Sequence, residues 1–329
     1  MSDQETMTAA YVTRPGPADE IRVGRLPVPE PGSSEVLVKV LALAVNHVDT
    51  FVRSGAYRTR LPYPFIIGRD LVGTAVAAAP GFAPGDLVWC NSLGLDGRQG
   101  SFSEYAVVPA DRLYHLPGGV DPENAVASLH TAATAYLGLF EEAGLRVGET
   151  IVVTGAGGGV GTATVQLAAA AGARVIATAR EEDFDWCRRC GADEVVDYHD
   201  PDMYPEIAKL APDGVDVFWD NAGLHHLEQT VPLLALGGRM VILAGLRAAP
   251  VLPVGQLYTR NASLRGFVIS NAGVTELAAA ATAINHLLAR GTLVSRIGMR
   301  LPLTEAARSH RLQEGAEQHR LRGRIVVLP

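Results

Sequence analysis

A glycine-rich stretch in the middle of the chain has the spacing that binds a diphosphate. The apolar run Ile151 to Val153 leads directly into Gly155, Gly158 and Gly161. Glycines at this spacing allow a sharp turn, let a diphosphate approach backbone N–H groups, and bring the following helix close to the sheet. The N-terminus of that helix then faces the anion. We therefore expect a dinucleotide to bind through Gly155, Gly157, Gly158, Gly159, Val160 and Gly161.

The choice of dinucleotide depends on the end of the next strand. A cofactor without a 2′-phosphate is usually held there by Asp or Glu. This sequence instead places Arg180 at that point, followed by Glu181. A guanidinium pairs well with a phosphate and stacks on adenine, so the sequence favours NADPH. NADH stays open as the alternative, because Glu181 can turn inward.

These residues require a strand, a glycine turn, a helix and a second strand. The helical pattern after Val160 ends at Gly172, and β-branched residues resume from Arg174 to Ala179. Further strand signals alternate with helical segments, which predicts an α/β fold with a doubly wound parallel sheet. A helical pattern over residues 123–140 is expected to lead into this part of the chain. These further strands are expected at residues 194–198, 215–219, 240–243 and 263–270.

The first 120 or so residues have a different pattern. Short strands, such as residues 36–42, 72–78 and 106–108, are separated by Pro and Gly turns, which predicts a β-rich, partly barrel-like domain. After a helix over residues 276–290, the closing segment LRGRIVVLP is expected to return to this domain as a strand. We therefore expect a β-rich substrate domain at 1–124 and 269–329, and a dinucleotide-binding domain at 125–268.

Composition limits the partners. The chain has 329 residues, of which 48% are hydrophobic, and a net charge of −7, which argues against nucleic acid and an anionic membrane as partners. The polar start MSDQETMTAA has no apolar core, so neither a secretory signal nor a transit peptide is expected. Cys90, Cys187 and Cys190 suit a reducing compartment. Cys187 and Cys190 are expected on a helix before Gly191, as core and surface residues. A cytoplasmic protein is the expectation.

Several further motifs resemble one family over almost the whole chain. They are Asn46, Asp49, Arg53, Gly55 and Tyr57, the segments PFIIGRD (64–70) and GDLV (85–88), the glycine stretch itself, GAD (191–193) with Tyr198, and GRIV (323–326). Together they resemble the zinc-free quinone oxidoreductase branch of the medium-chain dehydrogenase/reductase superfamily. The resemblance implies a Rossmann domain and a GroES-like catalytic domain.

Zinc alcohol dehydrogenases of that superfamily carry a cysteine ligand where Asn46 stands and a histidine where Arg69 stands. The four cysteines of their structural zinc lobe have no counterpart here either. His47 with Asp49, His130, and the pair His225 and His226 are other candidate ligands, but they lack tetrahedral ligand spacing, and solvated or capping roles are expected for them. No metal site is expected.

The resemblance implies hydride transfer from a reduced nicotinamide, in a cleft between the two domains. Asn46 is expected to hydrogen-bond in the pocket, and Tyr57 to donate to the developing enolate or quinol oxygen. Tyrosine is protonated at neutral pH and can donate, although a packed loop tyrosine and protonation by water remain alternatives. Phe51 stands where several members have a second aromatic hydroxyl, which predicts a more apolar pocket.

Other cofactor contacts are also implied by the resemblance. Tyr198 matches a residue at the adenosine end, with core packing as the alternative, and Thr134 matches a cofactor-facing threonine. Asn221 and Gly245 follow the fourth and fifth strands, where backbone approaches the cofactor, although turn chemistry alone also explains them. A lysine that often binds the 2′-phosphate is replaced in this chain by Glu182 and Asp183, so Arg180 must compensate. Arg265, Arg322 and Arg324 are expected at the solvated surface.

The sequence thus predicts an NADPH-dependent, metal-independent reductase of a small quinone or α,β-unsaturated carbonyl. Two alternatives stay open: a trans-acting enoyl reductase of a biosynthetic pathway, and a non-catalytic NADPH-binding regulatory or structural protein. The resemblance also implies a homodimer that pairs edge strands, with residues 264–269 as the candidate edge.

Overall fold

The computed structural model describes residues 5–315 and 321–329, and the contacts among them divide the chain into two compact units. Unit 1 comprises Met1–His130 and Gly273–Pro329, and unit 2 comprises Thr131–Ala272. The boundaries expected at 124 and 268 lie a few residues before those at His130 and Ala272. Unit 1 is therefore built from both ends of the chain, with unit 2 inserted between them.

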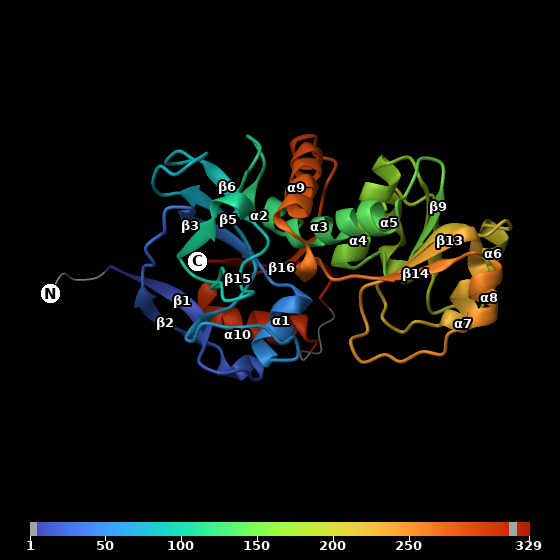
Figure 1. Ribbon diagram of the computed structural model, residues 1–329, viewed down its shortest axis with the longest axis horizontal. Coiled ribbons are helices and arrows are strands. Elements are labelled where there is room, and N and C mark those ends of the chain that lie inside the picture. The colour runs from blue at the N-terminus through green and yellow to red at the C-terminus, as the bar shows by residue number, and fades with distance from the viewer. Residues whose placement is uncertain (1–4, 316–320) are drawn as a thin grey trace. The chain divides into compact units, whose positions relative to one another are not determined.

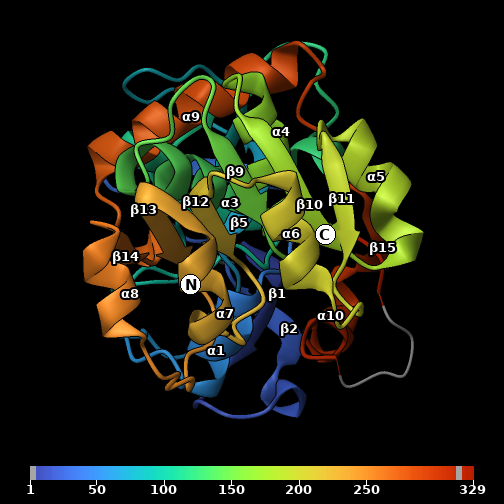
Figure 2. The same ribbon diagram turned by 90° about the vertical axis from the view of Figure 1, so that its right-hand side faces the viewer.

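Unit 2 contains a six-stranded sheet in the order β11-β10-β9-β12-β13-β14. All neighbouring strands are parallel, as expected for a doubly wound α/β fold. The order can be followed from right to left in Figure 2. The strands are β9 (Thr150–Val153), β10 (Arg174–Ala179), β11 (Glu194–Asp197), β12 (Val215–Asp220), β13 (Leu234–Ile242) and β14 (Ser263–Gly266).

The order of these strands reverses beside β9, because β10 and β12 flank it. Ligands of open parallel sheets bind at such a switch point, outside the carboxyl ends of the strands. The helices of this part of the chain are α3 (Leu129–Tyr136), a π-helix (Leu137–Glu142), α4 (Gly159–Ala170), α5 (Phe184–Arg189), α6 (Met203–Leu210), α7 (Leu227–Thr230) and α8 (Val254–Thr259). Short 3-10 turns lie at Glu181–Asp183, Val231–Leu233 and Ile269–Asn271.

Unit 1 contains a seven-stranded sheet and a three-stranded sheet (Figure 1). The larger has the order β15-β16-β3-β5-β6-β8, with β7 paired to β3, and the smaller has the order β2-β1-β4. The strands are β1 (Thr6–Val12), β2 (Arg22–Pro27), β3 (Glu35–Ala44), β4 (Phe65–Ile66), β5 (Asp70–Ala75), β6 (Leu87–Cys90), β7 (Tyr105–Pro109), β8 (Tyr114–His115), β15 (Ile297–Pro302) and β16 (Arg324–Leu328).

The strand β16 completes the larger sheet of unit 1. It pairs in parallel with β15 and antiparallel with β3, where Val326 lies opposite Ala44. The expected return of the closing segment to the N-terminal domain is therefore correct. The helices of unit 1 are α1 (His47–Ser54), α2 (Pro122–Val126), α9 (Val274–Ala289) and α10 (Ala306–Gln313), with 3-10 turns at Ala18–Glu20, Ala110–Arg112 and Leu303–Glu305.

Several sequence expectations need correction. The helical pattern expected over residues 123–140 is two α-helices followed by a π-helix, and the sixth strand of unit 2 ends at Gly266, short of residue 270. Cys187 and Cys190 are both buried, where one core and one surface residue were expected.

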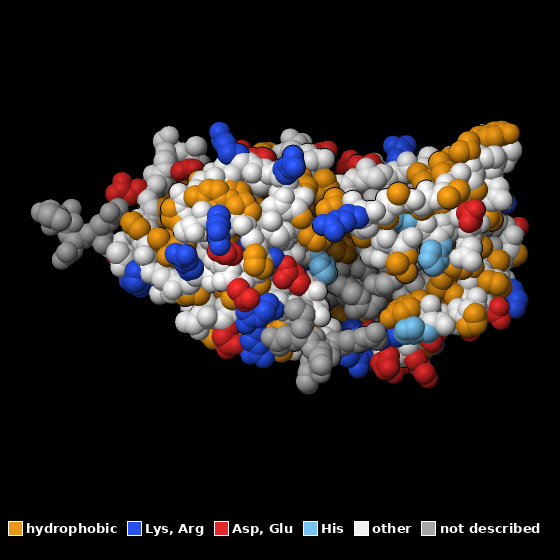
Figure 3. All heavy atoms as spheres, turned by 90° about the horizontal axis from the view of Figure 1, so that it is seen from below, with side chains coloured by type: hydrophobic (Ala, Val, Ile, Leu, Met, Phe, Trp, Pro, Cys, Tyr) orange, Lys and Arg blue, Asp and Glu red, His pale blue; other side chains and the backbone are white. Residues whose placement is uncertain are grey.

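The outer surface carries charges of both signs. No helix among the described residues has the length and apolar character that crossing a membrane requires. On the face drawn in Figure 3, basic and acidic side chains are interspersed.

Candidate functional site

The glycine turn of unit 2 leaves no space for side chains at two of its positions. A Cβ on Gly161 would lie 2.3 Å from the carbonyl oxygen of Gly155, and a Cβ on Gly157 would lie 2.8 Å from a carboxylate oxygen of Asp183. Gly155 also has a φ of +61°, in the left-handed region that glycine adopts without strain. The shape of the turn itself therefore favours glycine at positions 155, 157 and 161.

The turn leads into a helix start suited to an anion. Gly158 is the N-cap of α4, and the first backbone hydrogen bond of the helix runs from the Thr162 N–H to the Gly158 carbonyl, at 2.8 Å. The amides of Gly159, Val160 and Gly161 precede that bond, so they have no acceptor within the helix. A diphosphate fits this cradle, because it supplies acceptors and meets the positive end of the helix dipole.

Arg180 lies directly after β10 and is anchored by a neighbouring carboxylate. Its Nε donates to Oδ2 of buried Asp183 at 2.8 Å, and this hydrogen bond raises the pKa of the guanidinium. Because the contact uses Nε, the two Nη groups are the donors left for an anion. Tyr198 follows β11, and its N–H donates to the carbonyl of Ala179 at 3.2 Å, so it lies near the same strand end.

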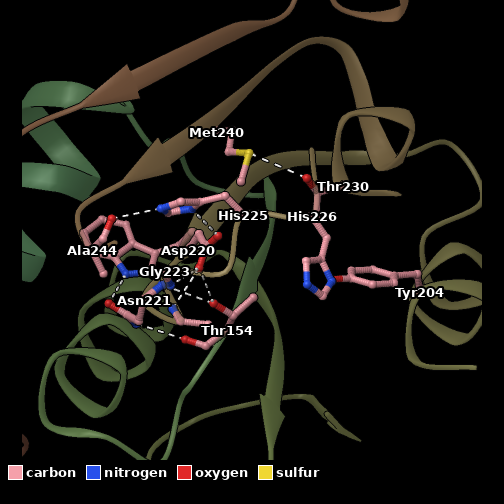
Figure 4. Close-up of polar contacts among 12 residues, drawn as sticks. Thr154, Tyr204, Asp220, Asn221, Gly223, His225, His226, Thr230, Met240 and Ala244 are labelled. Carbon is pink, nitrogen blue, oxygen red and sulfur yellow. Dashed lines mark hydrogen bonds and ion pairs between the residues drawn. The ribbon is translucent and has the colours of Figure 1, made fainter. Parts of the chain in front are cut away.

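A polar network joins the carboxyl ends of β9 and β12 (Figure 4). The N–H of Asn221 donates to Oγ1 of Thr154 at 3.1 Å, and its Nδ2 donates to the Thr154 carbonyl at 3.0 Å. Nε1 of Trp219 donates to Oδ1 of Asn221 at 2.9 Å. The amide of Asn221 therefore ties the two strand ends together, and only one of its N–H groups remains for a ligand.

The same network extends to the end of β13 through His225, which is buried. Its Nδ1 lies 2.8 Å from Oδ2 of Asp220, and its Nε2 lies 2.9 Å from the carbonyl oxygen of Ala244. The turns at Gly223 and Gly245 are in backbone contact, since a Cβ on Gly223 would lie 2.8 Å from the Gly245 nitrogen. His225 had been expected to be solvated or to cap a helix, and its burial corrects that expectation.

In unit 1, Asn46 lies at the centre of a buried network of charged groups. It precedes α1, and its Nδ2 donates to Oδ2 of Asp70 at 3.0 Å. Its Oδ1 accepts a hydrogen bond from Nη2 of Arg324, which also donates from Nε to the Ala127 carbonyl at 3.1 Å. Arg324 was expected at the solvated surface, but it is only 8% exposed, because these acceptors hold it inside the unit.

The carboxyl groups in this network are hard to ionise. Burial raises the pKa of Asp70 to about 8, and the neighbouring Asp49 adds to the effect. Burial also raises the pKa of Asp49 to about 6, against the hydrogen bond from the Asn46 N–H, which is 2.8 Å long. Arg69 and Arg324 partly offset both shifts. The network thus holds buried acids beside buried cations.

Tyr57 follows α1 through Gly55, which has a φ of +81°. Its N–H donates to the Phe51 carbonyl at 3.0 Å, and its half-buried ring packs against the core of unit 1. A negative charge on its oxygen would favour the charged form of Arg69, so the phenol and this guanidinium lie within electrostatic reach. The position suits a hydroxyl that donates to a developing oxyanion.

Possible metal ligands are scattered. In residues 5–315 and 321–329, no three His, Cys, Asp or Glu side chains lie close enough together to hold a metal ion. His130 is buried, which corrects the expectation of a solvated or capping histidine.

Both units match models of known families. Residues 32–118 match the alcohol dehydrogenase GroES-like domain, and residues 159–286 match the zinc-binding dehydrogenase family. The rat (Rattus norvegicus) quinone oxidoreductase is 33% identical over 288 residues, which cover 86% of each chain. The chain belongs to the quinone oxidoreductase branch of the medium-chain dehydrogenase/reductase superfamily. It is an oxidoreductase of an NAD(P)-binding family.

Other members of this superfamily are similar to it as well. Mouse (Mus musculus) prostaglandin reductase-3 is 32% identical over 313 residues, which cover 89% of this chain and 80% of that protein. A mycobacterial structure complexed with NADPH has a TM-score of 0.84 at 28% identity, covering 98% of this chain and all of the other. A structure described as an NAD-dependent alcohol dehydrogenase has a TM-score of 0.88 at 34% identity, with the same coverage.

The site residues expected from the sequence fall into both units of this oxidoreductase. Asn46 and Tyr57 lie in unit 1, 11 positions apart on either side of α1. Thr134 is buried on α3. The remaining expected cofactor residues lie at the carboxyl ends of the strands of unit 2: the glycine turn with Val160, Arg180, Tyr198, Asn221 and Gly245.

Sequence reasoning missed four residues that shape these sites. Asp70 and Arg324 hold Asn46, and Asp220 and His225 join the ends of β12 and β13. For Asp70 and Asp220 a signal existed, because each is an acid at one end of an apolar strand, Asp70 at the start of β5 and Asp220 at the end of β12. An acid buried at such a position needs a hydrogen-bond partner. For Arg324 and His225 no local signal distinguishes the buried from the exposed residue.

Proposed function

We propose that this protein is an NADPH-dependent, metal-independent reductase of quinones or α,β-unsaturated carbonyl compounds. The substrate class is supported by the names of its relatives, which include quinone oxidoreductases and a prostaglandin reductase. The observation that carries the cofactor part is the position of Arg180 at the end of β10 with its Nη groups available. Those donors match the extra phosphate of NADPH.

The metal-independent part of the proposal is supported by the donor set around Asn46. In the zinc alcohol dehydrogenases of the superfamily, the positions of Asn46 and Arg69 hold metal ligands. Here they carry an amide and a guanidinium, and the amide is engaged by Asp70 and Arg324. An amide already hydrogen-bonded at both ends and a cation are poor ligands for zinc.

Without a metal ion, groups of the protein must stabilise the negative charge that develops on the substrate oxygen. When bound, the reduced nicotinamide supplies the hydride. We assign Tyr57 the donation of a hydrogen bond to the oxygen that becomes negative, with Arg69 strengthening the local positive potential. We assign Asn46 the role of positioning α1 and the segment after it, which carries Tyr57. It holds the start of α1 through its hydrogen bond with Asp49 and ties that start to β5 through its hydrogen bond with Asp70.

The first experiment measures oxidation of NADPH and of NADH against quinones, enones and enoyl thioesters. Reduction of one acceptor class with NADPH preferred is the expected result. Tyr57→Phe should lower kcat about a hundredfold with little change in the KM for NADPH, because only a transition-state interaction is removed. Tyr105→Phe, which changes another half-buried tyrosine of unit 1, is the matched control.

Two outcomes would contradict the proposal in different ways. If NADPH binds and no acceptor is consumed, the protein is a cofactor-binding protein without this activity. If enoyl thioesters alone are reduced, the trans-acting enoyl reductase is the better assignment.

We also propose a cytoplasmic homodimer formed through β14. This strand is the last in the sheet order of unit 2, so one of its edges is not paired within the described residues. Unpaired edges readily accept a strand from a second copy. Light scattering should give twice the mass of one chain, with slow amide exchange in residues 263–266. A single-chain mass at micromolar concentration would contradict it.

A further inference from the structure

His225 occupies an unusual place between the ends of β12 and β13 (Figure 4). Its backbone is in the left-handed region, with a φ of +50°, which is uncommon for residues other than glycine. The residue is 5% exposed, and its ring lies within hydrogen-bond distance of a group on each strand end. Such a conformation persists only where the surroundings hold it in place.

Both partners of the ring accept hydrogen bonds. The carbonyl oxygen of Ala244, 2.9 Å from Nε2, can only accept, so Nε2 carries a proton. The carboxyl group of Asp220 lies 2.8 Å from Nδ1. Its other oxygen accepts from the N–H groups of Ala222 at 2.7 Å and Gly223 at 3.2 Å, and from Oγ1 of Thr154 at 3.3 Å.

Three donors engage this one oxygen of Asp220, so the other oxygen, Oδ2, is the one that faces Nδ1 of His225. The ring of His225 therefore bridges the two strand ends through its two nitrogens. One acceptor lies at the end of β12 and the other directly follows β13.

The ring of His225 also fills the space beside Gly245. A Cβ on Gly245 would lie 2.6 Å from Nε2 of His225 and 2.7 Å from the carbonyl oxygen of Gly223. Gly245 and Gly223 have φ values of +79° and +72°. The two turns thus fit against each other only without side chains, and His225 closes the contact from the buried side.

We infer that His225 is a positioning residue that holds the turns 221–223 and 244–246 together at the cofactor edge of the sheet. The inference rests on the proposed function, because it assigns these turns to the dinucleotide site. Ligands of open sheets bind outside the carboxyl ends of the strands, so both turns border that site. Because the two turns are already ordered in the free protein, cofactor binding does not have to include the free-energy cost of ordering them.

The test replaces His225 by asparagine, which accepts the left-handed backbone but is too short to bridge to Ala244. His226→Asn is the matched control, because the ring of this exposed neighbour has its hydrogen-bond partner outside the bridge: Nδ1 lies 3.1 Å from the hydroxyl of Tyr204. NADPH binding is measured directly by titration of its fluorescence, without an acceptor. Amide exchange of Ala222 and Gly223 is measured on the same free proteins.

We expect His225→Asn to raise the dissociation constant for NADPH about tenfold and to speed exchange of both amides. The value of kcat at saturating NADPH should stay within about twofold, whereas a general loss of structure would lower it in parallel. A long-range ¹H–¹⁵N spectrum of histidine-labelled protein should show a proton on Nε2 of His225, which faces the Ala244 carbonyl.

The outcomes separate the inference from the proposed function. Unchanged amide exchange, or an unprotonated Nε2, overturns the bridge. Faster exchange with unchanged NADPH affinity overturns its role in positioning the cofactor. If the unaltered protein binds neither NADPH nor NADH, the proposed function fails, while the exchange data still decide whether the bridge exists.

Discussion

At the scale of single residues, Arg180 controls the proposed preference for NADPH. Arg180→Gln should lower the ratio of kcat/KM for NADPH to that for NADH by about ten- to a hundredfold, because one charged hydrogen-bond donor to the 2′-phosphate is lost. Steady-state kinetics with both cofactors measure this ratio. Arg189→Gln, at an exposed arginine of α5, should leave it unchanged. An equal loss with both cofactors would show that Arg180 does not bind the 2′-phosphate.

Asp70 makes stability depend on pH. Its pKa is raised from 3.8 to about 8, so between these values the folded protein binds a proton that the unfolded chain releases. The free energy of unfolding must therefore fall as pH rises through this window, by up to about 1.4 kcal/mol per pH unit. Urea unfolding at pH 6 and pH 8 should show this fall in the unaltered protein and a smaller one in Asp70→Asn.

The control for that measurement is Asp111→Asn, at an exposed aspartate of the same unit, which should keep the original pH dependence. A stability that stays level from pH 6 to pH 8 in the unaltered protein would contradict a protonated Asp70.

Single residues also show where sequence reasoning fails. The strand, turn, helix and strand that hold the glycines and end before Arg180 were predicted correctly, because their signals lie within one βαβ unit. Arg324 was misread because its acceptor, Asn46, is 278 positions away in the sequence. Burial of a charge depends on such distant partners, and no local pattern records them.

At the scale of elements, Gly161 determines how closely α4 approaches the glycine turn. The atoms that a Cβ would meet are backbone atoms, namely the Gly155 oxygen at 2.3 Å and Cα of Ala156 at 2.7 Å, which cannot rotate away. Gly161→Ala should therefore cost about 1–3 kcal/mol of stability and weaken dinucleotide binding. Thermal unfolding and NADPH titration measure the two effects.

Gly255→Ala provides the comparison within the same unit. Gly255 lies in the exposed helix α8, and a Cβ there meets nothing within 4 Å. Alanine should leave cofactor binding unchanged and raise stability by up to about 1 kcal/mol. Equal effects of both substitutions would show that the contact with Gly155 is not what requires glycine at 161.

The elements themselves were largely predictable, and their ends were not. The parallel strands of unit 2 carry continuous apolar runs, which are a strong signal. The π-helix at Leu137–Glu142 has no such signal in the sequence. Its Gly138 packs so closely on the sheet that a Cβ there would lie 2.3 Å from the Trp219 ring. The close packing of residue 138 on β12 becomes visible only in the folded chain.

At the scale of the whole molecule, the stability of unit 1 depends on β16. This strand lies between β15 and β3, so a chain that stops at Gly323 leaves β15 without a paired strand and removes the partner of β3 at Leu43 and Ala44. Four of its residues are buried, which makes the loss apolar as well as hydrogen-bonding. Hydrogen exchange should show loss of protection in β3 and β5 in this truncated chain.

A chain that lacks only Pro329, which is exposed, should keep the protection of β3 and β5. Full protection in the chain that ends at Gly323 would mean that the sheet does not need β16.

The insertion of unit 2 between the two segments of unit 1 has a consequence for biosynthesis. A ribosome makes about 5–20 residues per second and releases the chain from its N-terminus, so all of unit 2 emerges before β16 exists. The start of β3 pairs early with β7, but its end at Leu43 and Ala44 must wait for β16 while the inserted domain folds. Slowing translation after residue 272 would lengthen the time during which this end of β3 has an unpaired edge that other chains can bind.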